Sequence, residues 1–531
     1  MGVYTNKGNG AFTDIRRGEY IDKTGLIGFT NKCISTESRY MCVTRGRRFG
    51  KSMAVDMLCA YYDKSCDSRQ LFEGLYIAEP DKEGEDRQFE KHLNRYPVLR
   101  LDLTDFLTKS GHDEKIVSII QNSVIKELLR AYPEVESEED DDLMDTLIKI
   151  RQNGKGMFIA LIDEWDAICR EFEDNKAVMD TYINLMRRLF KGSASKDVFA
   201  LAYITGILPI KRYNTESALN NFREYSMTKA TPLETFFGFT TDEAADIATK
   251  HDMSIEDLKA WYDGYKLGEA PSIYNPFSVM EAVQRRKCDN WWAQSGAYSK
   301  VSQYIQMNYE GLKDDMIGML SGAHCKVDID SFDNDPGDLL SKDNVMTILI
   351  HLGYLAYDSE ERECYIPNRE VREVMERAVR DCHWNNLTKV LRDSEQLLEA
   401  TLAMDEEAVA RGIDLAHDEN VSILSYNNEN SLSCVLSIAY IFARNKYTFV
   451  REMPTGKGFA DIVLIPRRGV DTPAILLELK YDKSARTAMD QIREKRHPAS
   501  LADMCGEVLM VGINYDKETK THTCTMERVE K

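Results

Sequence analysis

At 531 residues the chain is too long for a single hydrophobic core, and its 43% hydrophobic and 29% charged content is typical of a globular protein. The net charge of −20 argues against a protein that coats nucleic acid without preference, because such binding depends on neutralising phosphates. No run of about 18 apolar residues occurs and the N-terminus lacks the apolar centre of a secretory signal, so we expect neither a membrane span nor secretion. The 12 cysteines are scattered without a Cys-x-x-Cys pair, which favours reduced thiols in a cytoplasmic protein.

Four apolar runs in the N-terminal third, each bounded by turn or charge signals, predict buried strands. They cover residues 40–44, 97–103, 156–163 and 198–205. Helical patterns at 115–132 and 177–190 lie between them. Strands that alternate with helices predict an α/β fold with a parallel sheet covered on both faces.

The first of these strands leads into the segment RGRRFGKS and then into a helical pattern from residue 51 to 62. A strand, a glycine-containing loop and a helix form the context in which backbone N–H groups bind phosphate. We expect Arg47, Arg48 and Gly50 to contact a nucleotide. Lys51 would reach its β- and γ-phosphates, and Ser52 would hold Mg²⁺.

The loop departs from the usual phosphate-binding pattern at its first position. That pattern has a glycine five residues before Gly50, where this chain has Arg45, and the nearest glycine is Gly46. A glycine there permits a tight turn, which other residues make at a cost in backbone strain. We therefore expect nucleotide binding, with a loop that differs from the common form.

The third predicted strand ends in Asp163 and Glu164, and the fourth ends in Thr205. An aspartate at the end of such a strand can order the Mg²⁺ shell, and a neighbouring glutamate can polarise the attacking water. The Thr205 hydroxyl could sense the γ-phosphate. A solvated turn is the alternative interpretation of the acidic pair, but the upstream Gly-Lys-Ser favours a P-loop ATPase with a catalytic glutamate.

Residues 232–385 are predicted to be mostly helical and to form a lid or middle domain. Helix starts are indicated at Thr240 and Ser254, each with an acidic residue three positions later, and a further helix begins after Pro276.

The pattern changes again from Glu429, where a helix, a hairpin, a buried strand and a second helix are predicted. The second hairpin strand carries Asp461 and the next strand carries Glu478 and Lys480. Residues two apart on a strand face the same side, so Glu478 and Lys480 project together, and strand pairing would bring Asp461 beside them.

Such a group could bind Mg²⁺ or Mn²⁺ through Asp461 and Glu478, while Lys480 positions the attacking water. Glu429 could add a metal ligand, and Gln491 on the following helix could touch the site. A solvated strand face is the alternative, but the apolar run before Glu478 indicates a central strand, where unpaired charges would be costly. From Glu429 onward the chain has 16 Lys and Arg against 14 Asp and Glu, so any nucleic-acid surface is expected here.

At these residues the sequence resembles a bacterial and archaeal family in which a predicted AAA-type ATPase domain is fused to a C-terminal PD-(D/E)XK nuclease-superfamily domain. The family's loop typically has arginine at the first position, as here, and proline where this chain has Gly46. The PD-(D/E)XK pattern corresponds to Asp461, Glu478 and Lys480, with Ala460 in place of the proline. The resemblance rests on YIDKT (20–24), RRFGKS (47–52), LFEGL (71–75), LIDEWD (161–166), TGI (205–207), WYDGY (261–265), YNPFS (274–278), HLGYL (351–355) and IPN (366–368).

Together these observations predict an ATPase domain at 1–231, a helical middle domain at 232–385 and a restriction-endonuclease-like α/β domain at 386–531. We expect an ATP- and Mg²⁺-dependent enzyme that cleaves nucleic acid, DNA rather than RNA, under nucleotide control. A homo-oligomer is expected only by analogy with other ATPases of this type. Two alternatives stay open: a nucleotide-driven switch or scaffold that binds nucleic acid or protein without cutting, and an ATPase that acts only on proteins.

Overall fold

The structure is a computed structural model, and the chain forms two compact units in it. Unit 1 comprises Met1–Ala297 and Lys326–Val374, and unit 2 comprises Tyr298–Cys325 and Met375–Lys531. The three-domain division at 231/232 and 385/386 stays a prediction. The structure describes residues 2–82, 84–210, 219–292, 298–307, 309, 311–320, 322–330, 332, 341–381, 385–420, 435–436, 439–455, 458–466, 472–494 and 507–530.

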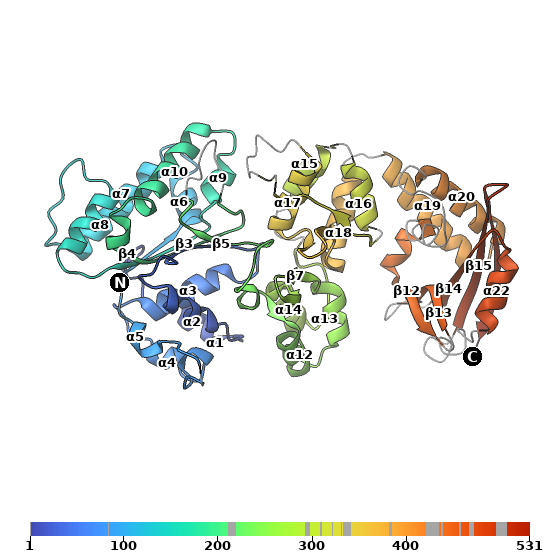
Figure 1. Cartoon of the computed structure of the whole chain (residues 1–531), viewed down its shortest axis with the longest axis horizontal. Helices are drawn as coiled ribbons and strands as arrows, with labels where there is room; N and C mark the ends of the chain where they lie inside the picture. Colours follow the sequence, from blue (N-terminus) through green and yellow to red (C-terminus); the bar gives the residue numbers. More distant parts are fainter. Residues whose placement is uncertain are drawn as a thin grey trace. The chain divides into compact units, whose positions relative to one another are not determined.

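A five-stranded parallel sheet forms the centre of unit 1 (Figure 1). Its spatial order is β2-β3-β4-β1-β5, so β4 lies between the phosphate-loop strand and the acidic strand. The four predicted strands are confirmed, and the three-residue β5 is additional. The strands are β1 (Tyr40–Thr44), β2 (Val98–Asp102), β3 (Phe158–Asp163), β4 (Phe199–Gly206) and β5 (Arg223–Tyr225).

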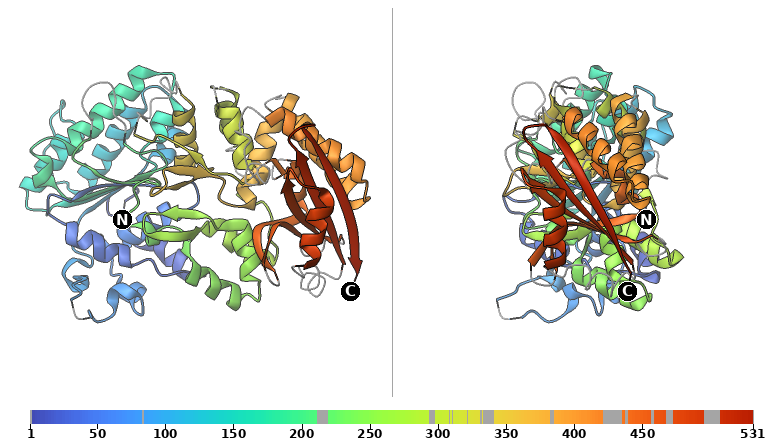
Figure 2. Two further views of the ribbon diagram at one scale, coloured as in Figure 1. Left: turned by 45° about the vertical axis from the view of Figure 1, so that its right-hand side comes forward. Right: turned by 90° about the vertical axis from the view of Figure 1, so that its right-hand side faces the viewer.

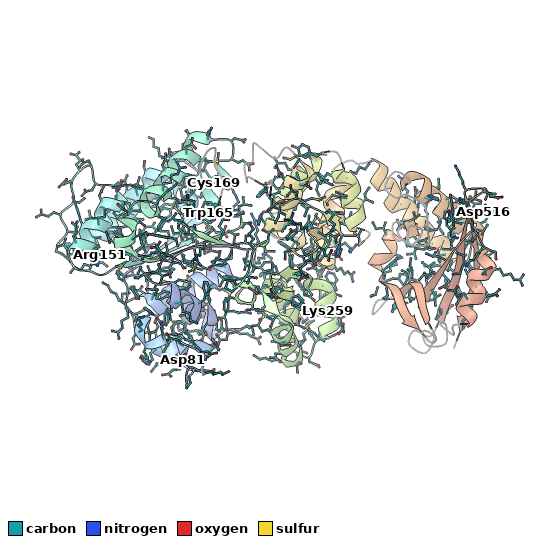
Figure 3. All side chains as sticks on the ribbon, in the orientation of Figure 1. Asp81, Arg151, Trp165, Cys169, Lys259 and Asp516 are labelled. Atoms are coloured by element: carbon teal, nitrogen blue, oxygen red, sulfur yellow. The ribbon has the colours of Figure 1, made fainter. Side chains whose placement is uncertain are left out.

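Helices cover both faces of this sheet because successive strand residues point to opposite sides. Leu99 and Leu101 share one core with α7, α8 and α10, while Val98 belongs to the other core with α2 and α3. Figure 1 shows α7, α8 and α10 on one side of the sheet and α2 and α3 on the other. Trp165, labelled in Figure 3, is buried in the first of these cores. The helices of this part are α1 (Gly10–Arg17), α2 (Gly25–Cys33), α3 (Lys51–Tyr62), α4 (Arg69–Phe72), α5 (Phe89–His92), α6 (Leu103–Ser110), α7 (Ile116–Ala131), α8 (Leu143–Gln152), α9 (Ala167–Glu171), α10 (Lys176–Phe190) and α11 (Ser195–Val198).

The middle of the chain is largely helical, as predicted, and the predicted helix starts are confirmed. Thr240, Ser254 and Asn275 each accept a hydrogen bond from the backbone N–H three residues later, which caps the following helix. A small sheet in the order β6-β8-β7 and a β10–β11 hairpin were not predicted. The elements are β6 (Phe239–Thr240), α12 (Thr241–Lys250), α13 (Ile255–Tyr262), β7 (Tyr265–Leu267), β8 (Ala270–Tyr274), α14 (Pro276–Arg285), α17 (Lys342–Leu352), β10 (Ala356–Asp358), β11 (Glu363–Tyr365) and α18 (Arg369–Asp381).

Unit 2 contains a five-stranded mixed sheet in which β14 and β15 are parallel and the other pairs are antiparallel. Helices α19 and α20 pack on one face and α22 on the other (Figure 2). The elements are α15 (Tyr298–Gln306), α16 (Leu312–Leu320), α19 (Asn385–Leu402), α20 (Glu406–Asn420), β12 (Tyr447–Thr455), β13 (Gly458–Pro466), β14 (Ala474–Tyr481), α22 (Ala485–Glu494), β15 (Glu507–Asp516) and β16 (Thr521–Glu530).

The predicted hairpin, strand and following helix of unit 2 are confirmed. The predicted helix from Glu429 begins outside the described residues, and its last part is a short 3-10 helix at Ile441–Asn445 followed directly by β12. Among the helices that the structure describes, none is long and apolar enough to cross a membrane.

Candidate nucleotide and nuclease sites

The phosphate loop lies at the carboxyl end of β1 and runs directly into α3. Gly50 caps this helix with φ 88°, in the left-handed region that glycine enters without a steric penalty. Arg48 has φ 68°, an uncommon value for a residue with a side chain. The loop therefore depends on contacts elsewhere in unit 1 to hold its conformation.

Arg45 occupies the position of the usual first glycine, and its side chain is fully buried. Its guanidinium donates hydrogen bonds to the backbone oxygens of Thr44 (2.9 Å), Tyr225 (2.8 Å) and Leu233 (3.3 Å). It also lies 5.2 Å from the centre of the Phe237 ring. Burial lowers the pKa of Arg45 to about 10. An arginine at this position thus ties the loop to β5 and to the segment that follows it.

The next residue, Gly46, lies against the end of α17. A Cβ atom at this position would be 3.2 Å from the Gly353 Cα and 3.3 Å from the Leu352 carbonyl oxygen, closer than ordinary contact. Arg48 donates to the Trp291 carbonyl oxygen at 3.1 Å and lies over the Phe277 ring at 3.7 Å. The loop is therefore supported by the middle of the chain as well as by the sheet.

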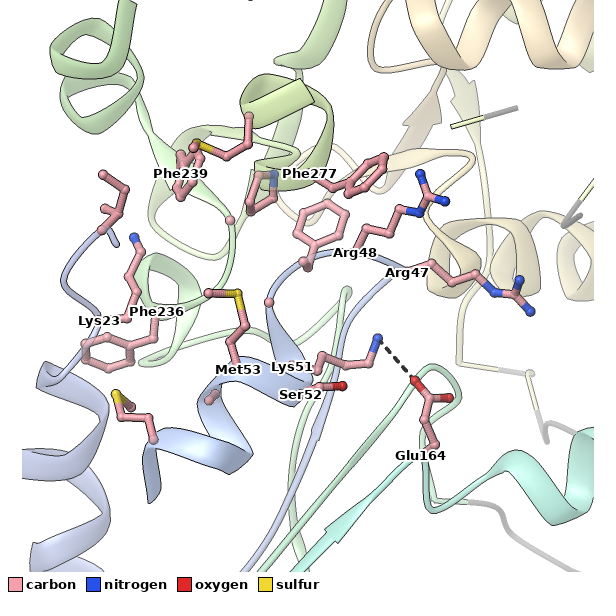
Figure 4. Close-up of a pocket in the computed structure, with 18 of the residues that line it drawn as sticks. Lys23, Arg47, Arg48, Lys51, Ser52, Met53, Glu164, Phe236, Phe239 and Phe277 are labelled. Atoms are coloured by element: carbon pink, nitrogen blue, oxygen red, sulfur yellow. Dashed lines mark ion pairs between the residues drawn. The ribbon is translucent and has the colours of Figure 1, made fainter. Parts of the chain in front are cut away.

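Lys51 extends back into the loop that precedes it. Its Nζ donates to the carbonyl oxygens of Arg45 and Gly46, each at 3.1 Å, and lies 3.9 Å from Glu164 Oε1 (Figure 4). The side chain is only 5% exposed, and this burial lowers the pKa of Lys51 against the opposing effect of Glu164. The ammonium group is thus placed where the loop can direct it at a bound phosphate.

Asp163 ends β3 next to Asp102 of β2 and is fully buried. Its Oδ1 accepts the Glu164 backbone N–H at 3.0 Å, and its Oδ2 has no hydrogen-bond partner among the described residues. Burial raises the pKa of Asp163 to about 6, while the neighbouring Ser52 hydroxyl acts in the opposite direction. A buried oxygen left without a donor, beside a hydroxyl, fits a hard cation such as Mg²⁺.

Glu164 lies in the turn after β3 with φ 50°. Its Oε2 is 2.5 Å from Arg170 Nη2, and Arg170 Nε donates to Asp166 Oδ2 at 2.9 Å. Neither Asp166 nor Arg170 was predicted from the sequence as part of the site. The four-residue spacing between Asp166 and Arg170 is only a weak signal of a functional pair, because oppositely charged residues at this spacing are common on helix surfaces.

Thr205 does not join the other predicted nucleotide-binding residues. Its side chain is fully buried, and its hydroxyl donates to the Val43 carbonyl oxygen of β1 at 2.8 Å. The hydroxyl therefore serves the pairing of β1 with β4 and is not among the groups that line the cavity at the loop.

A cavity of about 740 Å³ opens in front of the loop. Lys51, Ser52 and Glu164 lie at one side of it, and Phe236 and Phe239 at the other (Figure 4). It is lined by Glu19, Tyr20, Ile21, Lys23, Arg47, Arg48, Phe49, Gly50, Lys51, Ser52, Met53, Ala54, Met57, Asp102, Thr104, Glu164, Arg170, Ile207, Phe236, Gly238, Phe239, Pro276, Phe277 and Met280.

In unit 2 the predicted acidic residues and lysine come together on β13 and β14. Ile462 pairs with Leu477, and Asp461 Oδ2 accepts the backbone N–H of Leu479 at 2.8 Å. Glu478 is fully buried, and its Oε1 lies 3.7 Å from Lys480 Nζ. The register of these two strands thus produces the expected arrangement.

Gln491 of α22 donates its side-chain amide to Glu478 Oε1, as its predicted place near the site implied. Glu429 lies outside the described residues. Within the part of the chain that the structure describes, no group of three or more His, Cys, Asp or Glu side chains is arranged to hold a metal ion. A metal here would use Asp461 and Glu478 and complete its shell with water and substrate oxygens, which suits Mg²⁺.

Two family models match the regions that hold these sites. Residues 7–215 match a family described as predicted AAA-ATPase, and residues 427–524 match the PD-(D/E)XK nuclease superfamily. A search of curated proteins found no match. The solved structures that show similarity include the structure of C. elegans PCH-2 (12% identity over 66% of this chain and 68% of that one, TM-score 0.20). They also include the structure of the Aeropyrum pernix ORC1 protein in complex with DNA (10% identity over 71% of this chain and 98% of that one, TM-score 0.22).

The ranges that the two family models match contain the predicted site residues that the structure describes, and each range holds most of one of the two five-stranded sheets. The chain has a predicted AAA-ATPase-like domain in its N-terminal part and a PD-(D/E)XK nuclease-superfamily domain in its C-terminal part.

Proposed function

We propose that this chain binds and hydrolyses ATP at the phosphate loop and cleaves nucleic-acid phosphodiester bonds in unit 2 under the control of that nucleotide. The observation that carries the proposal is that each unit gathers a lysine and two acidic side chains at one place. These are Lys51, Asp163 and Glu164 in unit 1 and Lys480, Asp461 and Glu478 in unit 2.

The cavity in unit 1 suits a purine nucleoside triphosphate. Its end near the loop offers Lys51 and the guanidinium groups of Arg47 and Arg48, whereas Phe236 and Phe239 are part of an apolar remainder. Aromatic walls hold a base by stacking, and a few polar groups fix the orientation of the ligand.

The reaction would rest on positioning and electrostatics. Lys51 would turn from the loop carbonyls to the β- and γ-phosphates and offset their charge. Ser52 and Asp163 would hold Mg²⁺, which supplies further charge neutralisation at the phosphates. Glu164 would accept a proton from the attacking water.

In unit 2, Asp461 and Glu478 would hold Mg²⁺ or Mn²⁺, which supplies Lewis-acid polarisation of the phosphodiester. Lys480, beside Glu478, would orient the water and stabilise the negative charge that develops on the phosphate. Gln491 would hold the Glu478 carboxylate in place. We propose nucleic acid, DNA rather than RNA, as the substrate; from Glu429 onward 16 Lys and Arg outnumber 14 Asp and Glu, which favours a ligand that carries phosphates. A cytoplasmic location is proposed because the cysteines that the structure describes form no disulfide with one another.

Nucleotide control is supported by a chain of contacts inside unit 1. Arg48 of the loop bonds to the Trp291 carbonyl oxygen, and the backbone N–H groups of Trp291 and Trp292 both donate to Glu370 Oε1 at 2.8 Å. Glu370 belongs to α18, the helix within which the chain passes from unit 1 to unit 2 at Val374. A change at the loop on nucleotide binding could therefore reach the segment that leads to unit 2.

The test is cleavage of supercoiled, linear and single-stranded DNA and of RNA in Mg²⁺ and then Mn²⁺, with and without ATP. Lys480→Ala is compared with Lys483→Ala, which removes an exposed lysine two residues beyond β14. We expect the wild type and Lys483→Ala to cleave at similar rates. The cleavage rate of Lys480→Ala should be about 10²–10³-fold lower. The release of phosphate from ATP is measured in the same samples, and Lys51→Ala serves as the inactive control.

If neither metal supports cleavage of any substrate, the nuclease half is wrong. Nucleotide-dependent binding of nucleic acid or protein, without products and indifferent to Lys480→Ala, would then favour a switch or scaffold.

A further inference from the structure

Arg170 is the best-placed side chain in the nucleotide site to which the predicted mechanism gives no part. It belongs to the short helix α9 and lines the cavity together with Glu164. Its Nη2 contacts Glu164 Oε2 at 2.5 Å, a short charge-assisted hydrogen bond. The acidic group proposed to activate water is therefore held by a specific cation.

The position of Arg170 is itself fixed by Asp166, the residue that precedes α9. Asp166 is almost fully buried and accepts the backbone N–H groups of Ile207 (3.2 Å) and Leu208 (3.0 Å), just after β4. Its Oδ2 also accepts Arg170 Nε at 2.9 Å. The Arg170 guanidinium is thus held by the Asp166 carboxylate, which in turn is held by backbone N–H groups at the end of β4.

Glu164 has two carboxylate oxygens with different surroundings. Oε2 is occupied by Arg170, whereas Oε1 lies 3.9 Å from Lys51 Nζ at the phosphate end of the cavity. The backbone of Glu164 has a left-handed φ of 50°, which costs energy for a residue with a side chain and persists only where neighbours enforce it. A carboxylate held by one oxygen leaves the other directed at the place where the attacked phosphate would lie.

We propose that Arg170 is a positioning residue for ATP hydrolysis: it holds Glu164 by one oxygen so that the other faces the water that attacks the γ-phosphate. The proposal rests on the ATPase function proposed above. Arg170 would act through Glu164 and need not touch the nucleotide. Misplacing a catalytic group by about 1 Å can reduce a rate by about 100-fold.

The test compares steady-state ATP hydrolysis by full-length wild type, Arg170→Ala and Arg170→Lys, and Arg188→Ala serves as the matched control. Arg188 also binds two carboxylates, Asp142 and Asp145, but it is half-exposed on α10 and does not line the cavity. We expect kcat to fall about 10–100-fold in Arg170→Ala with KM for ATP changed less than about threefold. Arg170→Lys should recover part of the loss, and Arg188→Ala should match the wild type.

A double-mutant cycle with Glu164→Gln separates positioning from other roles. If Arg170 acts through Glu164, adding Arg170→Ala to Glu164→Gln should change the residual rate by less than about twofold. An equal loss of kcat in both backgrounds, a kcat unchanged or raised in Arg170→Ala, or a loss confined to KM would each overturn the proposal.

Thermal unfolding of each variant identifies a loss of rate that comes only from misfolding. If Arg170→Ala is misfolded, a folded Arg170→Lys tests whether Arg170 positions Glu164, by the same criteria for kcat and KM. If the wild type binds and hydrolyses no ATP, the proposed function fails first, and that result is distinct from an active wild type with an equally active Arg170→Ala.

Discussion

The two candidate sites contain similar groups for binding a phosphate, one lysine and two acidic side chains each. They differ in the backbone elements that carry these side chains. In unit 2, Asp461, Glu478 and Lys480 lie on two neighbouring strands, and the strand register brings them together. In unit 1, Lys51 follows a loop that the buried Arg45 side chain ties to Tyr225 and Leu233, and Glu164 lies in a turn and is held by the Arg170 side chain. A site on paired strands follows from local geometry, whereas a site on loops depends on the tertiary contacts that hold the loops.

This difference leads to an expectation about substitutions. Changes far from the cavity in sequence should disturb the nucleotide site, because Tyr225, Leu233 and Trp291 all provide carbonyl oxygens to arginines of the loop. The nuclease site should respond mainly to its own residues and to Gln491.

The largest effect is expected from Glu164→Gln, which keeps the shape of the side chain and removes the proton acceptor. General-base catalysis contributes about 10²–10⁴-fold, so phosphate release should fall by that factor while ATP binding is retained. Binding of a fluorescent ATP analogue and phosphate release measure the two quantities. A variant that hydrolyses ATP at more than half the wild-type rate would show that Glu164 is not the base.

Arg45→Ala should destabilise unit 1 by about 3 kcal/mol, because three buried carbonyl oxygens lose a donor and a cavity is left. ATP affinity should fall with it, since the loop loses its support. Denaturant unfolding followed by fluorescence measures the first effect. Arg188→Ala, whose partly exposed ion pairs are worth less than about 1 kcal/mol, is the control, and equal shifts in both variants would contradict the role of Arg45.

Glu370 should make the stability of unit 1 depend on pH. Burial raises the pKa of Glu370 to about 7, above the 4.5 of an ordinary glutamate, although the Ser278 hydroxyl and two backbone N–H groups oppose the shift. Between these values the folded protein binds a proton that the unfolded chain has released, so this group's contribution to the free energy of unfolding falls as pH rises from about 4.5 to 7, by up to about 3 kcal/mol.

Glu370→Gln removes that dependence, and its stability relative to the wild type should therefore rise from pH 5 to pH 8. Urea unfolding of both proteins at the two pH values measures the difference. A difference that stays constant with pH would show that Glu370 is ionised in the folded protein throughout this range.

Gln491→Ala should reduce cleavage by about 10–100-fold, since Gln491 holds a proposed metal ligand through its side-chain amide. The loss should be partly recovered at higher Mg²⁺ concentration. Arg486→Ala on the exposed side of the same helix is the control. If both variants cleave equally well, Gln491 only packs against Glu478.

The smallest effect is expected from Thr205→Val, which removes one buried hydrogen bond to Val43. Stability should fall by about 1 kcal/mol and kcat for ATP should stay within about twofold of the wild type. Thermal unfolding and phosphate release check both numbers. A tenfold fall in kcat with ATP binding unchanged would restore Thr205 as a sensor of the γ-phosphate.

The sequence by itself predicted the elements of both sheets that carry chemistry, because their patterns are local. Short, mostly apolar runs bounded by turn or charge signals identified β1 to β4, and helix caps such as Thr240 fixed the start of α12. The pairing of Glu478 with Lys480 followed from the two-residue period of a strand. Asp461 joined them because consecutive antiparallel strands usually pair.

Only the tertiary structure decided the function of side chains whose partners lie far away in the chain. Arg45 could not be understood from the loop alone, because its acceptors are 180 and 188 residues away. Nor could the sequence tell that the Thr205 hydroxyl bonds across the sheet or that Arg170 reaches Glu164. Local spacing determines which face of a strand or helix a residue occupies, but the partner that it meets there depends on how distant segments pack.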